Sequence, residues 1–310
     1  MQITPLQSAK KDPIMKYLLV VLAMTTCLSS FARSQSSKVL DSCSMKSEIL
    51  NGERKYAVYL PPGYDSSTRS YPVLYLLHGG GDDQTGWVQF GEVQLIADKA
   101  IIDGKATPMV IVMPDANSGR RGFFNDVRGD WRYEDFFFQE FMPFVEKEYR
   151  IKADKRFRAV AGLSMGGGGS FMYALHHPEL FSSACPLSAS TGPLSFEEAK
   201  ERTLRRGPGT PPETDAEKPT DEQIKAHYMQ HSTLELVNSV PDNQKKAVRW
   251  YIDCGDDDSL YEGNALVHIA MRKKEIPHEY RVRDGGHKWS YWREALPNVL
   301  GFISQSFHQE

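Results

Sequence analysis

The chain has few cysteines, little net charge and no apolar run of membrane-spanning length. Among its 310 residues are four cysteines, and Cys27 lies in an N-terminal apolar segment. The others, Cys43, Cys185 and Cys254, allow at most one disulfide bridge, which argues against a disulfide-built scaffold. Cys185 and Cys254 lie in apolar runs and are expected to be buried free thiols. The formal charge of −3 argues against nucleic-acid partners and anionic membranes.

The N-terminus has the pattern of an export signal. In "MKYLLVVLAMTTCLSSFARSQ" the apolar core is about a dozen residues long, too short for a membrane-spanning helix. Ser30 and Ala32 place small residues at positions −3 and −1 of a cleavage site, which predicts a secretory signal peptide over 1–32. Met15 is an alternative start. We expect an exported mature chain, periplasmic or extracellular. A lipid anchor at Cys27 and an uncleaved segment are the alternatives.

Apolar runs bounded by turn residues predict strands that alternate with helices. The predicted strands cover 54–64, 71–81, 108–117, 157–164, 181–190, 247–255 and 278–287. The predicted helices cover 134–151, 168–181 and 291–307, the last interrupted near Pro297. This alternation predicts an α/β fold with a mostly parallel central sheet flanked by helices. We expect one domain over 33–310.

One segment departs from this alternation. "RRGPGTPPETDAEKPTDEQ" (205–223) is rich in proline and charge and has no apolar periodicity. We expect it to be exposed, within a charged insertion over 195–245 that follows a strand and lies over the site as a lid. The alternative is a solvated excursion far from the site.

The stretch "VAGLSMGGGGSF" (160–171) places one serine among glycines. Residues 162–166 match G-x-S-x-G, in which a strained strand-to-helix turn exposes the serine Oγ. Ser164 is therefore the candidate nucleophile, with Gly167, Gly168 and Gly169 expected to let the helix begin close to neighbouring strands. The pattern alone also fits a glycine-rich turn. The phosphate-loop pattern G-x-x-x-x-G-K-[ST] is absent.

A serine nucleophile needs a base and an orienting carboxylate, which follow it in the chain order Ser, Asp or Glu, His. His287 meets this order in a glycine-flanked loop before the last helix, and is predicted to be the base. Asp256, Asp257 and Asp258 all follow a late strand, and the pattern alone does not choose among them. Three adjacent carboxylates also allow a Ca²⁺ site, although a solvated loop is commoner. Asp253 lies inside the strand and is expected to be structural.

The stretch "LLHGGGDDQTGW" (76–87) is the third element. Backbone N–H groups after such a strand complete an oxyanion hole with the N–H of the residue that follows the nucleophile, here Met165. His78 precedes the serine, against the expected order, so we expect it to form structural hydrogen bonds. Aromatic residues near these motifs are candidates for an acyl or sugar platform, with core packing as the alternative: Trp87, Tyr133 and Trp289, and also Phe123, Phe124 and Tyr291.

Taken in order, "LYLLHGGGDDQTGW", "MPDAN", "AGLSMGGGGSFMYALHHPELF", "IDCGDDDSL" and "GGHKWSYW" resemble the esterase D-like superfamily. The most similar group is carbohydrate esterase family 1, with its feruloyl and acetylxylan esterases. The resemblance covers about residues 45–305 and implies an α/β-hydrolase fold with a Ser-Asp-His triad. It places the acid at Asp258 and one oxyanion donor at Gly80. His78 replaces an aspartate of some relatives, and the charged insertion is atypical.

These features predict an exported carboxylic-ester hydrolase that acts through an acyl-enzyme and needs neither cofactor nor metal. Its expected partner is an ester-bearing oligo- or polysaccharide, such as feruloylated or acetylated xylan of the plant cell wall. The alternatives with the same triad are a short-chain esterase, an S-formylglutathione hydrolase relative and an acyltransferase. The export signal argues against a cytosolic thioester substrate. A non-catalytic carbohydrate-binding protein is the remaining alternative, but no triad residue is missing.

Overall fold

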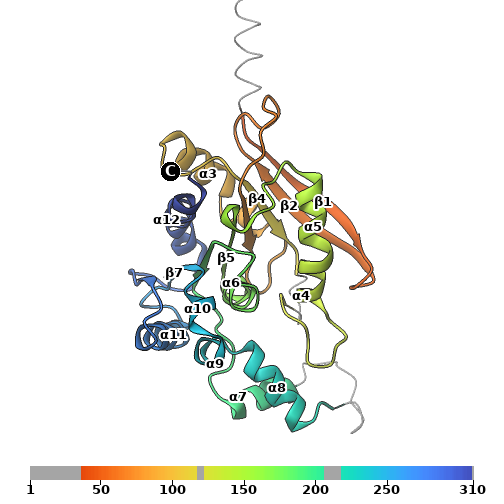
Figure 1. Cartoon of the computed structure of the whole chain (residues 1–310), viewed down its shortest axis with the longest axis vertical. Coiled ribbons are helices and arrows are strands. Elements are labelled where there is room, and N and C mark those ends of the chain that lie inside the picture. The colour runs from red at the N-terminus through yellow and green to blue at the C-terminus, as the bar shows by residue number, and fades with distance from the viewer. Residues whose placement is uncertain (1–35, 117–121, 206–217, 309–310) are drawn as a thin grey trace, which may run out of the picture.

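A computed structural model describes residues 36–116, 122–205 and 218–308 (Figure 1). The predicted signal peptide lies outside these residues. The described chain forms an eight-stranded sheet with the order β1-β2-β4-β3-β5-β6-β7-β8. The strands are β1 (Lys38–Ser47), β2 (Gly52–Leu60), β3 (Val73–Leu77), β4 (Val110–Pro114), β5 (Arg158–Leu163), β6 (Ser183–Leu187), β7 (Arg249–Asp253) and β8 (His278–Arg281). The six strands β4, β3, β5, β6, β7 and β8 are parallel to one another. At one edge of the sheet, β1 pairs antiparallel with β2, and β2 pairs antiparallel with β4.

Helices cover both faces of the sheet. One apolar core cluster lies on each face of the sheet. Residues of α3 and α12 belong to the cluster on one face, and residues of α4–η1–α5, α6, α9 and α11 belong to the cluster on the other. Their bounds are α2 (Gly86–Gln89), α3 (Val93–Ile102), α4 (Tyr133–Phe136), the π-helical η1 (Phe137–Phe141), α5 (Met142–Glu148), η2 (Lys155–Phe157), α6 (Met165–His176), α7 (Phe196–Leu204), α8 (Asp221–His231), α9 (Thr233–Ser239), α10 (Asp242–Lys245), α11 (Tyr261–Lys273) and α12 (Trp289–Phe307).

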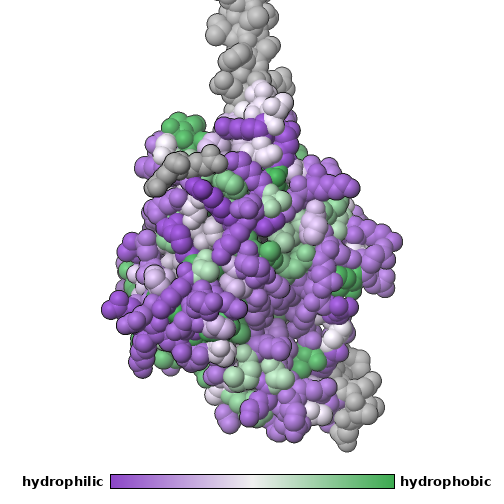
Figure 2. Space-filling view, in the orientation of Figure 1, coloured by the Kyte–Doolittle hydropathy of each residue, from purple (hydrophilic) through white to green (hydrophobic). Residues whose placement is uncertain are grey.

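The central strands are apolar on both faces because both faces are covered. In β3, Val73, Tyr75 and Leu77 belong to one core cluster, while Leu74 and Leu76 belong to the other. Parallel strands covered by helices on two sides are expected to form such continuous apolar runs. The predicted α/β architecture is therefore confirmed. The face of the molecule in Figure 2 is mostly hydrophilic, with a small apolar patch over α3.

Two elements differ from the sequence-based expectation. The N-terminal strand β1 was not predicted, because its residues are mostly polar and exposed and lack apolar alternation. The predicted interruption at Pro297 is wrong, since α12 continues through it. A proline inside a helix removes one N–H donor, but Leu296, Val299 and Leu300 are all buried on the core side of this helix, and this packing maintains it.

The region 195–245 contains α7 to α10. Residues 206–217 lie outside the described structure, but 221–223 form the first turn of α8 rather than a loop. Thr220 caps this helix through a reciprocal capping box with Gln223, a pattern that satisfies otherwise unpaired helix donors. The helices α7 and α8 share a small apolar cluster formed by Phe196, Ala199, Ile224 and Tyr228.

The described cysteines are all free thiols. Cys185 and Cys254 are buried, as predicted, and burial raises the pKa of the Cys254 thiol to about 12. Both therefore remain protonated and serve as small apolar side chains. In the ranges that the structure covers, every helix is too short or too polar to cross a membrane.

Candidate active site

Parallel strands bring the predicted site residues to one edge of the sheet. Ser164 follows β5 near the centre, Asp258 lies in the loop after β7, and His287 lies in the loop after β8. The carboxyl ends of parallel strands meet at the same edge, where open α/β sheets bind their ligands. Residues more than a hundred positions apart in the chain therefore become neighbours.

Ser164 adopts a strained backbone conformation. Its φ is 54° and its ψ is −114°, a combination that costs a non-glycine residue of the order of 1–3 kcal/mol. The turn also requires close backbone contacts. A Cβ atom added at Gly162 would lie 2.5 Å from the Gly166 carbonyl oxygen, and one added at Gly166 would lie 2.5 Å from the Leu77 carbonyl oxygen. The flanking glycines are required because no larger residue fits this turn.

The additional glycines have the same cause. A Cβ added at Gly167 would lie 2.7 Å from the carbonyl oxygen of Leu187, and one at Gly168 would lie 2.2 Å from that of Ser190. The first turn of α6 is thus packed directly against backbone that follows β6. The prediction that the glycine cluster lets this helix begin close to neighbouring strands is confirmed.

Among the three predicted triad residues, His287 lies within hydrogen-bond distance of both Ser164 and Asp258. His287 Nε2 is 2.9 Å from Ser164 Oγ, and His287 Nδ1 is 3.0 and 2.9 Å from the two oxygens of Asp258. Asp258 is only 1% exposed. Burial alone would raise its pKa, but hydrogen bonds from His287, Ser188 and the Leu260 N–H lower it below the ordinary value. The carboxylate therefore stays ionised beside the imidazole.

Of the three loop aspartates, only Asp258 contacts the histidine. The Asp256 carboxylate accepts hydrogen bonds from the N–H of Asp257 in its own loop and from that of Gly285 in the loop after β8. In the described chain, the carboxylates of Asp256, Asp257 and Asp284 come within 4.8 Å of one another and are all exposed. Exposed acidic groups of this kind are common without an ion, so we assign them no metal role.

The loop after β3 borders Ser164. A Cβ added at Gly79 would lie 3.6 Å from Ser164 Cβ, so the segment that carries Gly80 passes beside the serine.

His78 is buried, with Nδ1 2.8 Å from the Gly79 carbonyl oxygen and Nε2 accepting from the Ala116 N–H at 3.0 Å. Burial lowers the pKa of His78, so its neutral ring joins this loop to the segment after β4. This matches its predicted structural role.

Ser188 supports the triad but carries no motif. It follows β6, is fully buried and has a φ of 44°. Its hydroxyl hydrogen-bonds the Asp258 carboxylate and accepts from the Trp292 indole N–H at 3.0 Å. The Trp292 ring in turn lies edge-on to His287, with ring centroids 4.9 Å apart. The sequence shows only an ordinary serine in "PLSAS", so only the fold reveals this contact.

The loop that carries His287 is anchored by Asp253. This carboxylate is fully buried and accepts hydrogen bonds from the hydroxyls of Tyr251 (3.0 Å) and Tyr291 (2.5 Å) and from the guanidinium of Arg283 (3.2 Å). Arg283 and Tyr291 flank His287 on either side in the sequence. Asp253 is therefore structural, as predicted, and it ties β7 to the histidine loop.

The aromatic platform was predicted incorrectly in part. Trp87 and Tyr133 are both 0% exposed. Their polar atoms donate to backbone, the Trp87 indole to the Leu77 carbonyl oxygen and the Tyr133 hydroxyl to that of Asp115. Their partners are core groups, so neither ring is available to substrate. Trp289 is half-buried and packs against Trp87 and against Phe90, which is 49% exposed. Phe123 and Tyr291 are also buried, whereas Phe124 is half-buried.

A strained serine turn at the centre of a parallel sheet, with a histidine and a buried carboxylate after later strands, defines the α/β-hydrolase class. The model of the Esterase family, described as "Putative esterase", matches residues 47–303, and the chain belongs to this family. The chain is a serine esterase, and the resemblance inferred from its motifs is confirmed.

Three relatives illustrate the similarity. A ferulic acid esterase of known structure is 33% identical, with a TM-score of 0.75 over 88% of this chain and 100% of that chain. An endo-1,4-beta-xylanase/feruloyl esterase of Xylanibacter ruminicola is 39% identical over 145 residues, which are 43% of this chain and 19% of the relative. Esterase Rv1288 of Mycobacterium tuberculosis is 30% identical over 250 residues, 74% of this chain and 51% of the relative. The chain thus spans at most about half the length of these two curated relatives.

Proposed function

We propose that this serine esterase is exported and removes feruloyl or acetyl groups from plant cell-wall polysaccharide such as xylan. The observation that carries the proposal is the 33% identity with a ferulic acid esterase over the full length of that chain. The partial similarity to a xylanase/feruloyl esterase supports the same class of substrate. The proposal needs no cofactor.

In the first step, Ser164 Oγ attacks the ester carbonyl carbon while His287 Nε2 takes the hydroxyl proton. The 2.9 Å separation of these atoms is suited to this transfer. Asp258 accepts from Nδ1, which keeps Nε2 free as the base and stabilises the imidazolium that forms. His287 then donates its proton to the leaving sugar oxygen, and the C–O bond breaks to leave an acyl-serine.

The negative oxygen of each tetrahedral intermediate needs hydrogen-bond donors. The backbone N–H of Met165, at the start of α6, and that of Gly80, in the loop beside Ser164, are the proposed donors. In the second step, His287 activates a water molecule that attacks the acyl carbon. The acid is released, and the proton returns to Ser164.

Chromatography of the acids released from defined polysaccharides tests this function. Feruloylated arabinoxylan and acetylated xylan are incubated with the protein, with Ser164→Ala as the matched control. Release of ferulate or acetate by the parent alone supports the proposal. Hydrolysis of p-nitrophenyl acetate without release from either polysaccharide would contradict it and favour a short-chain esterase. S-formylglutathione, and an alcohol acceptor added to the ester assay, test the thioesterase and acyltransferase alternatives.

A further inference from the structure

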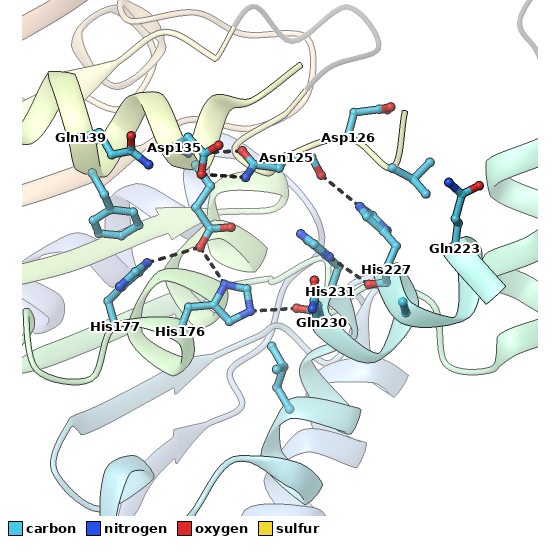
Figure 3. A pocket seen from close by; sticks show the side chains of 15 residues that line it. Asn125, Asp126, Asp135, Gln139, His176, His177, Gln223, His227, Gln230 and His231 are labelled. Atoms are coloured by element: carbon cyan, nitrogen blue, oxygen red, sulfur yellow. Dashed lines mark hydrogen bonds and ion pairs between the residues drawn. The ribbon is translucent and has the colours of Figure 1, made fainter. Parts of the chain in front are cut away.

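A cavity lies at the C-terminal end of α6, the helix that begins after Ser164. It has a volume of about 760 Å³ and is bordered by the 125–127 loop, α4 with η1, the C-terminus of α6, α8 and α9 (Figure 3). Volumes of this size are typical of small-molecule sites. The helix α6 begins after Ser164 and has 12 residues, so at about 1.5 Å per residue its last residue, His176, which lines the cavity, is about 18 Å along the helix from the serine.

Two of the carboxylates that line this cavity have charged or polar side-chain partners. Glu134 Oε1 lies 2.7 Å from His176 Nδ1, and Asp135 accepts from Asn125 Nδ2 at 3.0 Å and from Arg132 Nε at 2.7 Å. The third lining carboxylate, Asp126, accepts from the Arg128 backbone N–H at 2.7 Å. Within the described chain, no lysine or arginine lines the cavity. A cavity lined by carboxylates and by no lysine or arginine does not favour a phosphate or a carboxylate. A neutral ligand fits it better.

Several polar groups in the cavity remain uncommitted. His231 Nδ1 lies 2.9 Å from the His227 carbonyl oxygen, whereas its buried Nε2 has no partner within the described chain. Burial, with the adjacent His227, lowers the pKa of His231 to about 4, so the ring is uncharged at neutral pH. The side-chain amides of Gln139 and Gln230 also border the cavity and hydrogen-bond to no other described residue. A ligand rich in hydroxyl groups complements this set, because hydroxyls both donate and accept.

Apolar side chains complete the lining. Phe138 and Leu236 contribute to the wall. Their apolar surface suits the C–H groups of a sugar ring, and the planar amides beside it suit the hydroxyl groups.

Phe124 connects this cavity to the catalytic edge. Its ring is 5.7 Å from that of His231, and a Cβ added at Gly168 would lie 3.8 Å from the Phe124 ring. At the other end of the same loop, a Cβ added at Gly122 would lie 3.7 Å from Met165 Sδ.

We propose that this cavity is a binding subsite for a neutral oligosaccharide, remote from the reacting ester. The inference rests on the proposed function in one respect: when an ester group of a polysaccharide lies at Ser164, the neighbouring unesterified sugar residues extend away from the serine. The 122–127 loop borders both sites, so one polysaccharide chain would contact the catalytic edge and the cavity together. The helix α8 of the 195–245 region would then contribute to substrate choice without taking part in the chemistry.

Isothermal titration calorimetry with unesterified xylohexaose and cellohexaose tests the subsite directly. The protein used is Ser164→Ala, so that no turnover occurs. Ala226 is exposed on α8 and lines the cavity, so Ala226→Trp should place an indole ring inside it and obstruct a ligand. Lys225→Trp places the same ring on the same helix outside the lining. We expect binding of at least one hexaose, weakened about tenfold or more by Ala226→Trp and unchanged by Lys225→Trp. No binding of either sugar, or equal affinities of the two variants, would overturn the proposal.

A kinetic comparison separates this inference from the proposed function. With Ser164 present, Ala226→Trp should lower kcat/KM for feruloylated xylo-oligosaccharides and leave that for methyl ferulate unchanged. Rapid hydrolysis of methyl ferulate with no binding of hexaoses would reject the subsite while the esterase function stands. If no feruloyl or acetyl ester is cleaved, the proposed function fails, and calorimetry still decides whether the cavity binds sugar.

Discussion

The catalytic edge and the cavity beside α8 use polar side chains in opposite ways. At the edge, Asp258 and Ser188 are buried and their side-chain oxygens have defined partners. In the cavity, the amides of Gln139 and Gln230 are exposed, and His231 Nε2 has no partner in the described chain. A reaction centre must be preorganised, because a misplaced base or acid loses transition-state stabilisation. A recognition surface must instead leave donors and acceptors free for its ligand.

Loss of the nucleophile should have the largest effect. Ser164→Ala should lower kcat for p-nitrophenyl acetate by about 10⁴-fold or more, because triad residues act as a unit. The fold should be unchanged, since alanine removes only the hydroxyl. Initial rates are measured beside circular dichroism spectra, and a fluorophosphonate should label the parent on the peptide that carries Ser164. Similar rates in variant and parent would refute the assignment of the nucleophile.

Removal of the acid's charge tests the buried end of the triad. Asp258→Asn should lower kcat on the order of 10⁴-fold, because an amide favours the wrong imidazole tautomer. The matched control is Asp257→Asn, an exposed neighbour in the same loop that does not contact His287. Its kcat should remain within a few-fold of the parent. The assignment fails if Asp257→Asn is the inactive variant.

Comparison of the parent with Asp258→Asn also gives a test by pH. Because the pKa of Asp258 is lowered in the folded state, its carboxylate stabilises the fold fully above the unfolded value of about 3.9. That stabilisation is lost as the pH falls through the lower, folded pKa. Urea unfolding between pH 3 and 7 should therefore show a difference between parent and Asp258→Asn that narrows towards acid. A difference that widens on acidification would contradict this sign.

Ser188 should matter less, because it acts through Asp258. Hydrogen bonds to charged groups contribute about 1.5–3 kcal/mol, so Ser188→Ala should lower kcat on the order of 10- to 100-fold with little change in KM. Ser182→Ala is the control. Ser182 lies just before β6, and its hydroxyl donates to the Arg158 carbonyl oxygen, away from the triad. A raised KM with unchanged kcat would show that Ser188 does not position the acid.

Substitution of the α6 glycines should lower the free energy of unfolding more than it lowers the rate of hydrolysis. Gly168→Ala places a methyl group about 2.2 Å from the Ser190 carbonyl oxygen, and such overpacking costs about 1–3 kcal/mol of unfolding free energy. In Gly301→Ala, on α12, the nearest atom outside the helix would be 3.6 Å away. That change should be neutral or stabilising by up to about 1 kcal/mol, since alanine favours helix. Urea unfolding compares the two, and equal effects would argue against tight packing at Gly168.

Sequence patterns predicted the parallel sheet and the neighbourhood of Ser164 and His287, because strand periodicity and chain order are local or sequential properties. They did not choose among three adjacent aspartates, which differ only in how the loop folds; the family resemblance pointed to Asp258. Burial of Trp87 and Tyr133 could not be foreseen, since aromatic residues beside a motif face either core or substrate. The start of α8 was missed despite a usable signal, the capping pattern "TDEQ".

The smallest expected effect tests whether the polar side chains that line the cavity contribute to stability. The Gln139 side chain is exposed and bonds to no other described residue, so Gln139→Ala should change the free energy of unfolding by less than about 0.5 kcal/mol. Hydrolysis of p-nitrophenyl acetate should also be unchanged, because Gln139 lies on η1 and borders the cavity at the end of α6 that is far from Ser164. Gln244→Ala, exposed on α10 and away from the cavity, is the control. Only hexaose affinity should distinguish the two variants. A large loss of stability in Gln139→Ala alone would show that the cavity's polar groups hold the fold together, as those of the catalytic edge do.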